Sequence, residues 1–174
     1  MIFPAGQMVA VLDGKVVGAA SSLIVMWDDY GLDHTWREVT GNGMFDTHNP
    51  TRKTLYGAEV FVDPAVRRRG IGRSLYAARR RLCRELNLRR IIAAGRLPGF
   101  HRHAHEMSAE TYAMKVIWGD IADPVLRFQL HEGFQFCGVI KGYLPADVES
   151  CGNAALIVWL NPGYRAPATQ PKSA

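Results

Sequence analysis

The sequence predicts an α/β fold in which helices flank a single mixed β-sheet. Short apolar runs rich in β-branched and aromatic residues alternate with segments whose apolar residues recur at helical spacing. The turns between these segments carry Gly, Asp-Pro or Asn, which commonly end such elements. With 174 residues, the chain is long enough for one domain that buries its own core.

The first two strands are predicted to form a hairpin. Met8–Leu12 and 15–25 are apolar, and Asp13-Gly14 between them suits a type I′ turn. Residues 28–54 indicate a long connection, because glycine, asparagine and proline recur through them. Within this connection we expect a short strand at His34–Val39.

A strand, a turn and a helix are predicted next. Leu55–Val62 is rich in β-branched and aromatic residues, which favours a strand, and Asp63-Pro64 turns the chain. The helix is predicted by apolar residues at helical spacing, with arginines on the opposite face: Ile71, Leu75, Ala78, Leu82 and Leu86. Arg90–Ala94 then predicts a short buried strand.

Two more helices and two strands complete the pattern. Ser108 can cap a helix with Glu110 in its first turn. Asp123 as cap, Pro124 at the first helical position and Gly133 just past the end bracket another helix. The remaining predicted segments are strands at Gln135–Ile140 and Ala155–Leu160, and a disordered, proline-rich tail over residues 163–174.

Composition limits the classes of protein to consider. Hydrophobic residues make up 48% and charged residues 21%, as in soluble globular domains, and no apolar run is long enough to span a membrane. No signal-peptide pattern opens the chain. Cys83, Cys137 and Cys151 form no Cys-x-x-Cys pair, so we expect reduced thiols in a cytoplasmic protein.

The most informative segment is the basic turn Arg67–Ser74, which contains Gly70 and Gly72. Glycines allow a tight turn and close approach to a ligand, and the following helix start offers free N–H groups to a phosphate. A P-loop and a dinucleotide fingerprint are excluded, because no lysine follows Gly72 and Leu75 stands where a third glycine would. The net charge of +5 is concentrated over residues 67–90, with ten arginines and one acid. Nucleic acid is an alternative ligand, but a polyanionic cofactor explains the patch more economically.

The pattern Arg67-x-x-Gly70-x-Gly72, with the apolar strand and Asp63-Pro64 before it, resembles the acetyl-CoA loop of the GNAT superfamily of acyl-CoA N-acyltransferases. Longer segments resemble the GNAT domain that some bacterial proteins carry fused to a nitrilase-type carbon–nitrogen hydrolase: His34–Gly43, Thr54–Val60, Leu86–Phe100, Met107–Glu110, Asp123–Leu126 and Tyr143–Pro145.

The resemblance implies a single GNAT domain over residues 1–162 with a long insertion at 28–54. The strand and helices that normally begin this fold, and that wall the acceptor site, have no counterpart before the first predicted strand. The wall could come from residues 28–54, from a second subunit or from an upstream segment. The exposed sheet edge predicts a homo-oligomer, most simply a two-fold dimer.

The resemblance also implies acetyl-CoA as acyl donor, an unidentified small-molecule or peptide amine as acceptor, direct attack in a ternary complex, and no metal or membrane. In the family, the pantetheine chain pairs with backbone in a gap between two strands, and the pyrophosphate lies at the loop, where arginines add charge-assisted bonds. The residues expected to contact the cofactor are Phe61, Val62, Arg67, Arg68, Arg69, Gly70, Ile71, Gly72, Arg73 and Ser74.

The chemistry requires a base for the amine and benefits from an acid for the leaving thiolate. Glu59 is the candidate base, because burial in an apolar strand would raise its pKa; a structural ion pair with an arginine is the alternative. Many family members have a tyrosine that acts as the general acid at the position where this chain has Gln129. The candidates for this role are therefore Tyr143 and Tyr112, and the alternative is that the thiolate leaves without an acid. A noncatalytic acyl-CoA-binding or protein-interaction module is therefore the alternative function.

Three alternating histidines, His101, His103 and His105, follow the strand at 90–94. No acidic or cysteine partner has ligand spacing nearby, so we expect substrate contact or plain surface in preference to a metal site.

Overall fold

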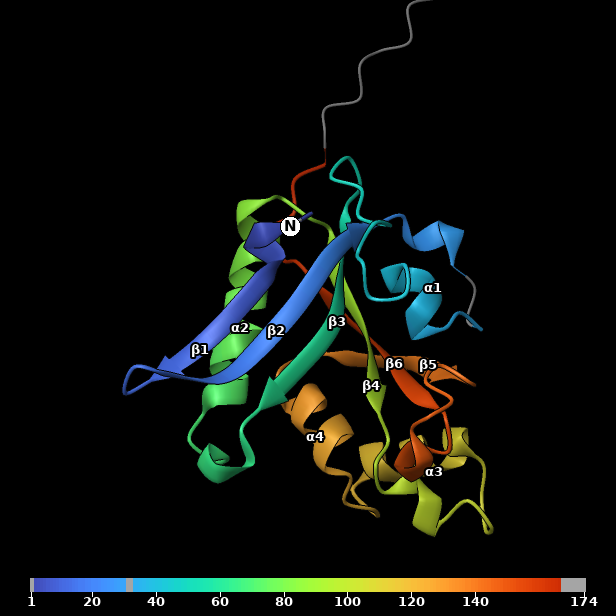
Figure 1. Cartoon of the computed structure of the whole chain (residues 1–174). Helices are drawn as coiled ribbons and strands as arrows, with labels where there is room; N and C mark the ends of the chain where they lie inside the picture. Colours follow the sequence, from blue (N-terminus) through green and yellow to red (C-terminus); the bar gives the residue numbers. More distant parts are fainter. Residues whose placement is uncertain (1, 31–32, 167–174) are drawn as a thin grey trace, which may run out of the picture.

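The computed structural model describes residues 2–30 and 33–166, and it has the predicted mixed sheet with helices on both faces (Figure 1). The strands are β1 (Gln7–Leu12), β2 (Lys15–Val25), β3 (Thr54–Val62), β4 (Arg90–Arg96), β5 (Gln135–Ile140) and β6 (Ala154–Leu160). The helices are α1 (Trp36–Thr40), α2 (Ile71–Glu85), α3 (Ala109–Trp118) and α4 (Pro124–His131). Short 3₁₀ turns lie at Pro4–Gly6, Trp27–Asp29, Pro64–Val66, Phe100–Arg102 and Val148–Ser150.

The strands lie side by side in the order β1-β2-β3-β4-β6-β5. β3 and β4 are parallel, and the other neighbouring pairs are antiparallel. The β1–β2 hairpin turns at Asp13 and Gly14, both with positive φ, as a type I′ turn requires.

One predicted element is wrong: His34–Val39 does not form a strand, because Trp36–Thr40 is helix α1. Thr35 and Glu38 form a reciprocal capping box at its start, and Gly41 ends it in the left-handed region with φ of 58°. The spacing Thr-x-x-Glu was the sequence signal for this helix. The other predicted strands and helices are confirmed to within two residues.

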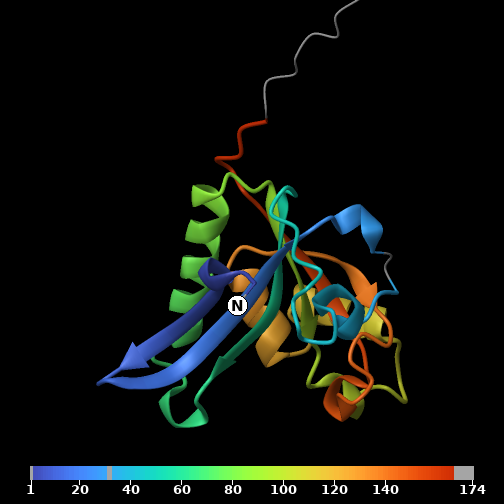
Figure 2. The ribbon, with the colours of Figure 1, turned by 45° about the horizontal axis from the view of Figure 1, so that its top comes forward.

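The two faces of the sheet bury separate apolar clusters. Alternation along β4 turns Ile91 and Ala93 toward the cluster packed by α2, α3 and α4, and turns Ile92 toward the other cluster. Val39 of α1 and Tyr143 belong to that second cluster. Figures 1 and 2 show α2 and α1 on opposite faces of the sheet. We call these the α2 face and the α1 face.

The described part of residues 28–54 therefore covers the α1 face. This segment is one of the three sources expected for the missing wall of the acceptor site. The cover is incomplete at the hairpin. Val9, Val11 and Val16 remain 63%, 59% and 61% exposed, on and beside the edge strand β1.

None of the helices that the structure describes is long and apolar enough to cross a membrane. Cys83 is buried, and Cys137 and Cys151 are exposed; all three are free thiols. Of the predicted tail, residues 167–174 lie outside the described residues. In its first part, the Arg165 N–H donates to Asn87 Oδ1 at 2.9 Å.

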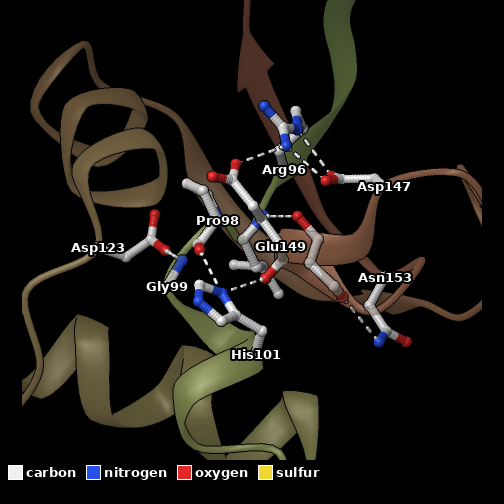
Figure 3. A network of polar contacts seen from close by, with 10 residues as sticks. Arg96, Pro98, Gly99, His101, Asp123, Asp147, Glu149 and Asn153 are labelled. Carbon is white, nitrogen blue, oxygen red and sulfur yellow. Dashed lines mark hydrogen bonds and ion pairs between the residues drawn. The ribbon is translucent and has the colours of Figure 1, made fainter.

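A polar network ties the end of β4 to the loop between β5 and β6 (Figure 3). The Arg96 guanidinium pairs with Asp147, whose carboxylate is buried, and with the exposed carboxylate of Glu149 at 2.9 Å. The Leu97 N–H donates to Ser150 Oγ at 2.9 Å. These contacts fix the chain where it leaves the sheet.

Asp147→Asn is expected to lower the free energy of unfolding at pH 7 by about 2 kcal/mol, because a charge-assisted bond to a buried carboxylate is lost. Hydrogen bonds from Arg96 hold the pKa of the Asp147 carboxyl below its usual value. The ionised carboxylate therefore contributes its full stabilisation at pH values above the pKa of about 4 that it has in the unfolded chain. This contribution is lost as the pH falls through the lower pKa that the group has in the folded protein. Urea unfolding at pH 7 and pH 3 measures both effects. Glu149→Gln is the matched control, with an expected change within about 0.5 kcal/mol, and equal losses would contradict the assignment.

Candidate functional site

The sheet opens between β3 and β4. The two strands pair only from Thr54–Arg90 to Gly57–Ala93. Beyond this point β3 continues to Val62 beside β2, and β4 continues to Arg96 beside β6, so their facing edges diverge. Figure 1 shows the widening gap. Strand edges that face each other without pairing can accept an extended ligand between them.

The backbone of β3 alternates between this gap and β2. The Phe61 carbonyl oxygen lies toward Gly18, because a Cβ on that glycine would come within 2.9 Å of it. Alternation then turns the backbone groups of Val60 and Val62 toward the gap. The backbone of Val62 thus faces the gap, while that of Phe61 faces β2 and the Phe61 side chain is 60% exposed.

A β-bulge lies where the gap begins. The β2–β3 register changes between Ser21, opposite Glu59, and Ser22, opposite Gly57, which leaves Ala58 as the extra residue. Ala58 packs on the α1 face, yet Val60, two residues later, packs on the α2 face. The bulge therefore reverses the alternation and turns Glu59 toward the α1 face.

Arg79 of α2 stabilises the bulge from the α2 face of the sheet. Its side chain is 1% exposed, and its Nη2 donates to the carbonyl oxygens of Ser21 at 3.0 Å and Glu59 at 2.8 Å. Its Nε donates to Ser22 Oγ at 2.9 Å. Gly57 leaves the room, since a Cβ there would lie 2.8 Å from Arg79 Nη1. Burial lowers the pKa of this guanidinium from its ordinary value, but an arginine stays charged at neutral pH.

The predicted phosphate loop forms the start of α2. Gly70 is the N-cap with φ of 79°, and within the described residues no side chain caps the helix. The first N–H groups and the helix dipole therefore point to a site suited to an anion. Arg67, Arg68 and Arg69 are exposed beside this helix start, and no ion pair is found for them among residues 2–30 and 33–166.

Many of the ten arginines in residues 67–90 have structural partners. Arg73 and Arg80 hold the buried carboxylate of Glu132 at 3.3 and 2.9 Å, although the Arg73 side chain remains 77% exposed. The other contacts are Arg81 to Glu85 at 3.7 Å, Arg84 over Trp159 at 5.2 Å, and Arg90 to Thr54 at 3.1 Å.

Gly72 makes room for a ring of α4. A Cβ at this position would lie 3.3 Å from Phe128 Cζ. A bulky residue at 72 would therefore press on α4 as well as on any ligand.

Gln129 of α4 lies directly over β4. A Cβ at Gly95 would come within 2.1 Å of Gln129 Oε1, so the amide occupies the space that a side chain would fill. Its Nε2 donates to the Tyr76 hydroxyl at 3.1 Å. The Oε1 atom is buried and has no hydrogen-bond partner in the described structure. A buried acceptor beside unpaired strand edges is suited to an N–H donor of a ligand.

The carboxylate of Glu59 is exposed, so the expected burial is wrong. The reason is the bulge, which turns the side chain to the open part of the α1 face. No ion pair of Glu59 is found within the part of the chain that the structure describes, so the alternative of an ion pair with an arginine is not observed there.

Tyr143 is buried on the same face and belongs to a hydrogen-bonded chain. Its hydroxyl oxygen lies 2.8 Å from that of Tyr56, which lies 3.4 Å from Nε2 of buried His34. Burial raises the pKa of Tyr143 well above its ordinary value, and the nearby charge of Glu59 adds to the increase. The hydroxyl therefore keeps its proton at neutral pH, as a hydrogen-bond donor or general acid must. Trp27 packs edge-on against His34 at 5.2 Å.

The sequence pattern missed His34 and Tyr56. They are 22 residues apart, and Tyr143 is 87 residues beyond Tyr56, so no local spacing marks the three as one cluster. Tyr112, the other candidate acid, is engaged elsewhere: its hydroxyl donates to the buried carboxylate of Asp123 at 2.9 Å.

The three loop histidines do not converge. His101 Nδ1 lies 3.0 Å from the Pro98 carbonyl oxygen and 3.1 Å from that of Glu149 (Figure 3). His103 and His105 lie beside the carboxylate of Glu106. Among the described residues, no group of three or more His, Cys, Asp or Glu side chains is arranged to hold a metal ion.

Comparison with known sequences gives one family and two relatives. The family described as "Acetyltransferase (GNAT) family" matches residues 2–108. The Bacillus subtilis (strain 168) protein named "Probable hydrolase YhcX" is 44% identical over 162 residues, which are 93% of this chain and 32% of the relative. The chain thus spans about a third of that relative's length. "Uncharacterized N-acetyltransferase YkwB" of the same organism is 36% identical over 163 residues, 94% of this chain and 72% of the relative.

Two solved structures have similar folds. The GphF GNAT-like decarboxylase in complex with isobutyryl-CoA is 25% identical with a TM-score of 0.75, covering 92% of this chain and 80% of that one. The loading GNATL domain of CurA from Lyngbya majuscula is 22% identical with a TM-score of 0.80, covering 92% and 79%. The Bacillus subtilis relative named a probable hydrolase is longer than this chain. This finding agrees with the expected resemblance to a GNAT domain that is fused to a hydrolase.

Proposed function

The chain belongs to the GNAT family of acetyltransferases, and from this premise we propose that it transfers the acetyl group of acetyl-CoA to an amine by direct attack in a ternary complex. The observation that carries the proposal is the gap between β3 and β4, which begins beside Glu59 and lies next to the start of α2. The family supports an acyl-CoA donor. The amine acceptor, small molecule or peptide, is our inference.

The residues beside the gap suit acyl-CoA. Uncapped N–H groups at the start of α2, with Arg67, Arg68 and Arg69, would hold the pyrophosphate, and Val62 would pair with pantetheine. The unpartnered Oε1 of Gln129 would accept a pantetheine N–H, which would satisfy an acceptor that is otherwise buried at a cost. Gln129 thus binds the donor in this proposal and does not protonate the thiolate.

The acceptor would approach on the α1 face. There, Glu59 would remove a proton from the attacking ammonium group, so that the neutral nitrogen forms the new C–N bond as the C–S bond breaks. Tyr143, which retains its proton, would supply a proton to the departing thiolate and would regain one from the second proton that the nitrogen loses as the amide forms. The products are an amide and the CoA thiol.

A second candidate function is decarboxylation of an acyl-CoA, favoured by the likeness to the GphF decarboxylase. A thioester with a carboxyl group on its α-carbon loses CO₂ when the bonding electrons move into a thioester enolate. Hydroxyl donors in a dry site stabilise an enolate oxygen, and the Tyr56–Tyr143 pair on the α1 face offers such donors. A proton then replaces CO₂ on carbon, and no amine is required.

Calorimetry with acetyl-CoA tests whether the protein binds an acyl-CoA, which both candidate functions require. Replacing Arg67, Arg68 and Arg69 together with glutamine is expected to weaken binding by at least about tenfold, since hydrogen bonds to charged groups contribute roughly 1.5–3 kcal/mol each. S-acetylpantetheine, which lacks the pyrophosphate, should bind wild type and variant equally. Arg81→Gln, on the exposed face of α2 beyond this loop, is the control and should change neither ligand's affinity. No detectable binding of acetyl-CoA to the wild type would end the proposal.

Turnover separates the candidates. Amine-dependent release of CoA thiol over a broad amine panel supports N-acetyltransfer, whereas conversion of malonyl-CoA to acetyl-CoA without an amine supports decarboxylation. Binding of acyl-CoA without either reaction would identify a noncatalytic module.

A dimer and a cytoplasmic location remain proposals. The exposed valines at the β1 edge support association through that edge, and the free cysteines suit a reducing compartment. Light scattering measures the oligomeric state directly.

A further inference from the structure

A second concave site lies at the end of the sheet away from the gap. Its cavity of about 210 Å³ is bordered by Val25, the last residue of β2, Thr54, the first of β3, and Arg90, the first of β4. Because β3 and β4 are parallel and diverge at their carboxyl ends, this cavity lies at their opposite, paired ends.

The lining of this cavity is strongly basic. Among the lining residues that the structure describes, four are cations and Asp28 is the single acid; the cations are Arg52, Lys53, Arg89 and Arg90. None of these four cations forms an ion pair with any acid in the described parts of the chain. Four like charges around one cavity with a single carboxylate repel one another, so a bound anion would stabilise the arrangement.

One donor in the lining is left without a partner. The Nε atom of Arg52 is buried, and within residues 2–30 and 33–166 it has no hydrogen-bond acceptor. An unsatisfied buried donor on a charged group is costly, because its bonds to water have been given up without replacement. Arg90 differs, since its Nε donates to Thr54 Oγ1 at 3.1 Å, which fixes that guanidinium at the rim.

We propose that this cavity, which we call the Arg52 cavity, binds a small oxyanion, such as phosphate or a carboxylate of a small organic acid. The cations of the lining supply the charge, and Arg52 Nε is a donor that lacks an acceptor in the described structure. The volume of about 210 Å³ suits a small ion. This site is separate from the loop at residues 67–74.

The Arg52 cavity shares one side chain with the cluster on the α1 face. Trp27 lines the cavity and also packs against His34 at 5.2 Å and Tyr56 at 6.4 Å, measured between ring centroids. An anion at this site would therefore change the environment of an indole, which gives binding an optical signal.

The test is titration with inorganic phosphate and, separately, with citrate at constant ionic strength set by chloride. Trp fluorescence and calorimetry should both report saturable binding. Arg52→Gln should weaken the binding by at least tenfold, whereas Arg81→Gln, which removes an equal charge from the exposed face of α2, should not. Trp27→Phe should abolish the fluorescence change and keep the calorimetric signal. Preference for phosphate over citrate, or the reverse, identifies the source of the oxyanion.

Two results would overturn the proposal. One is a response that does not saturate, or that is equal in wild type and Arg52→Gln. The other is loss of the phosphate signal when acetyl-CoA is bound, which would assign the ion to the loop at 67–74. Circular dichroism of Arg52→Gln confirms that the variant is folded. Because binding is measured without turnover, failure here leaves the proposed acyltransfer unaffected.

Discussion

Replacing Glu59 with glutamine is expected to lower kcat for amine-dependent release of CoA thiol by about 10²-fold or more, which is the usual contribution of a positioned general base. The amide keeps the size of the side chain but cannot take a proton from the attacking ammonium group. The affinity for acetyl-CoA should not change, because Glu59 faces away from the start of α2. Thiol release and calorimetry on the same samples measure the two quantities.

Glu85→Gln is the control for this experiment, since it removes an exposed carboxylate that pairs with Arg81 on α2. Its kcat should equal that of the wild type. If Glu59→Gln retained full turnover with an amine that the wild type acetylates, the assignment of Glu59 as base would be wrong.

The largest expected effect on stability comes from Arg79→Met. Methionine fills much of the same volume but donates no hydrogen bond, so the carbonyl oxygens of Ser21 and Glu59 lose their buried donor at the bulge. We expect the free energy of unfolding to fall by about 3 kcal/mol, since each buried group left unsatisfied costs roughly 1–3 kcal/mol and removal of a desolvated charge offsets part of this. Urea unfolding at pH 7 measures the change.

The same variant tests whether Arg79 positions Glu59. If the brace holds the bulge, Arg79→Met should lower kcat at temperatures where it is still folded, with little change in KM for acetyl-CoA. Arg84→Met is the matched control, because Arg84 lies on the same helix and contacts Trp159 without a buried hydrogen bond in the described structure. Equal stability of the two variants would contradict the bracing role.

Elements with a strong apolar period could be predicted from the sequence, and the site could be predicted only in part. The helix at 71–85 and the strand at 54–62 follow from side-chain spacing, which local physics dictates. Helix α1 has only five residues, too few to show a helical period, although its capping box at Thr35 was visible.

The bulge explains the main error about the site. Alternation along an unbroken strand predicts one face for Glu59, and a single extra residue at Ala58 reverses it. Nothing in the local sequence requires the bulge, because its brace, Arg79, comes from a helix twenty residues later. The arginines of residues 67–90 likewise could not be assigned separate roles from the sequence, because their partners lie on other elements. Only the tertiary contacts distinguish Arg67, Arg68 and Arg69 from the arginines that have structural partners.

The opening between β3 and β4 connects the two faces of the sheet, and for an enzyme of the proposed kind this bears on the order of kinetic events. A donor held at the start of α2 and an acceptor arriving beside Glu59 would reach the reacting carbon from opposite sides. Neither would block the path of the other, so the architecture imposes no compulsory order of addition. The amide product and the CoA thiol could likewise depart independently, each by the side from which its parent entered.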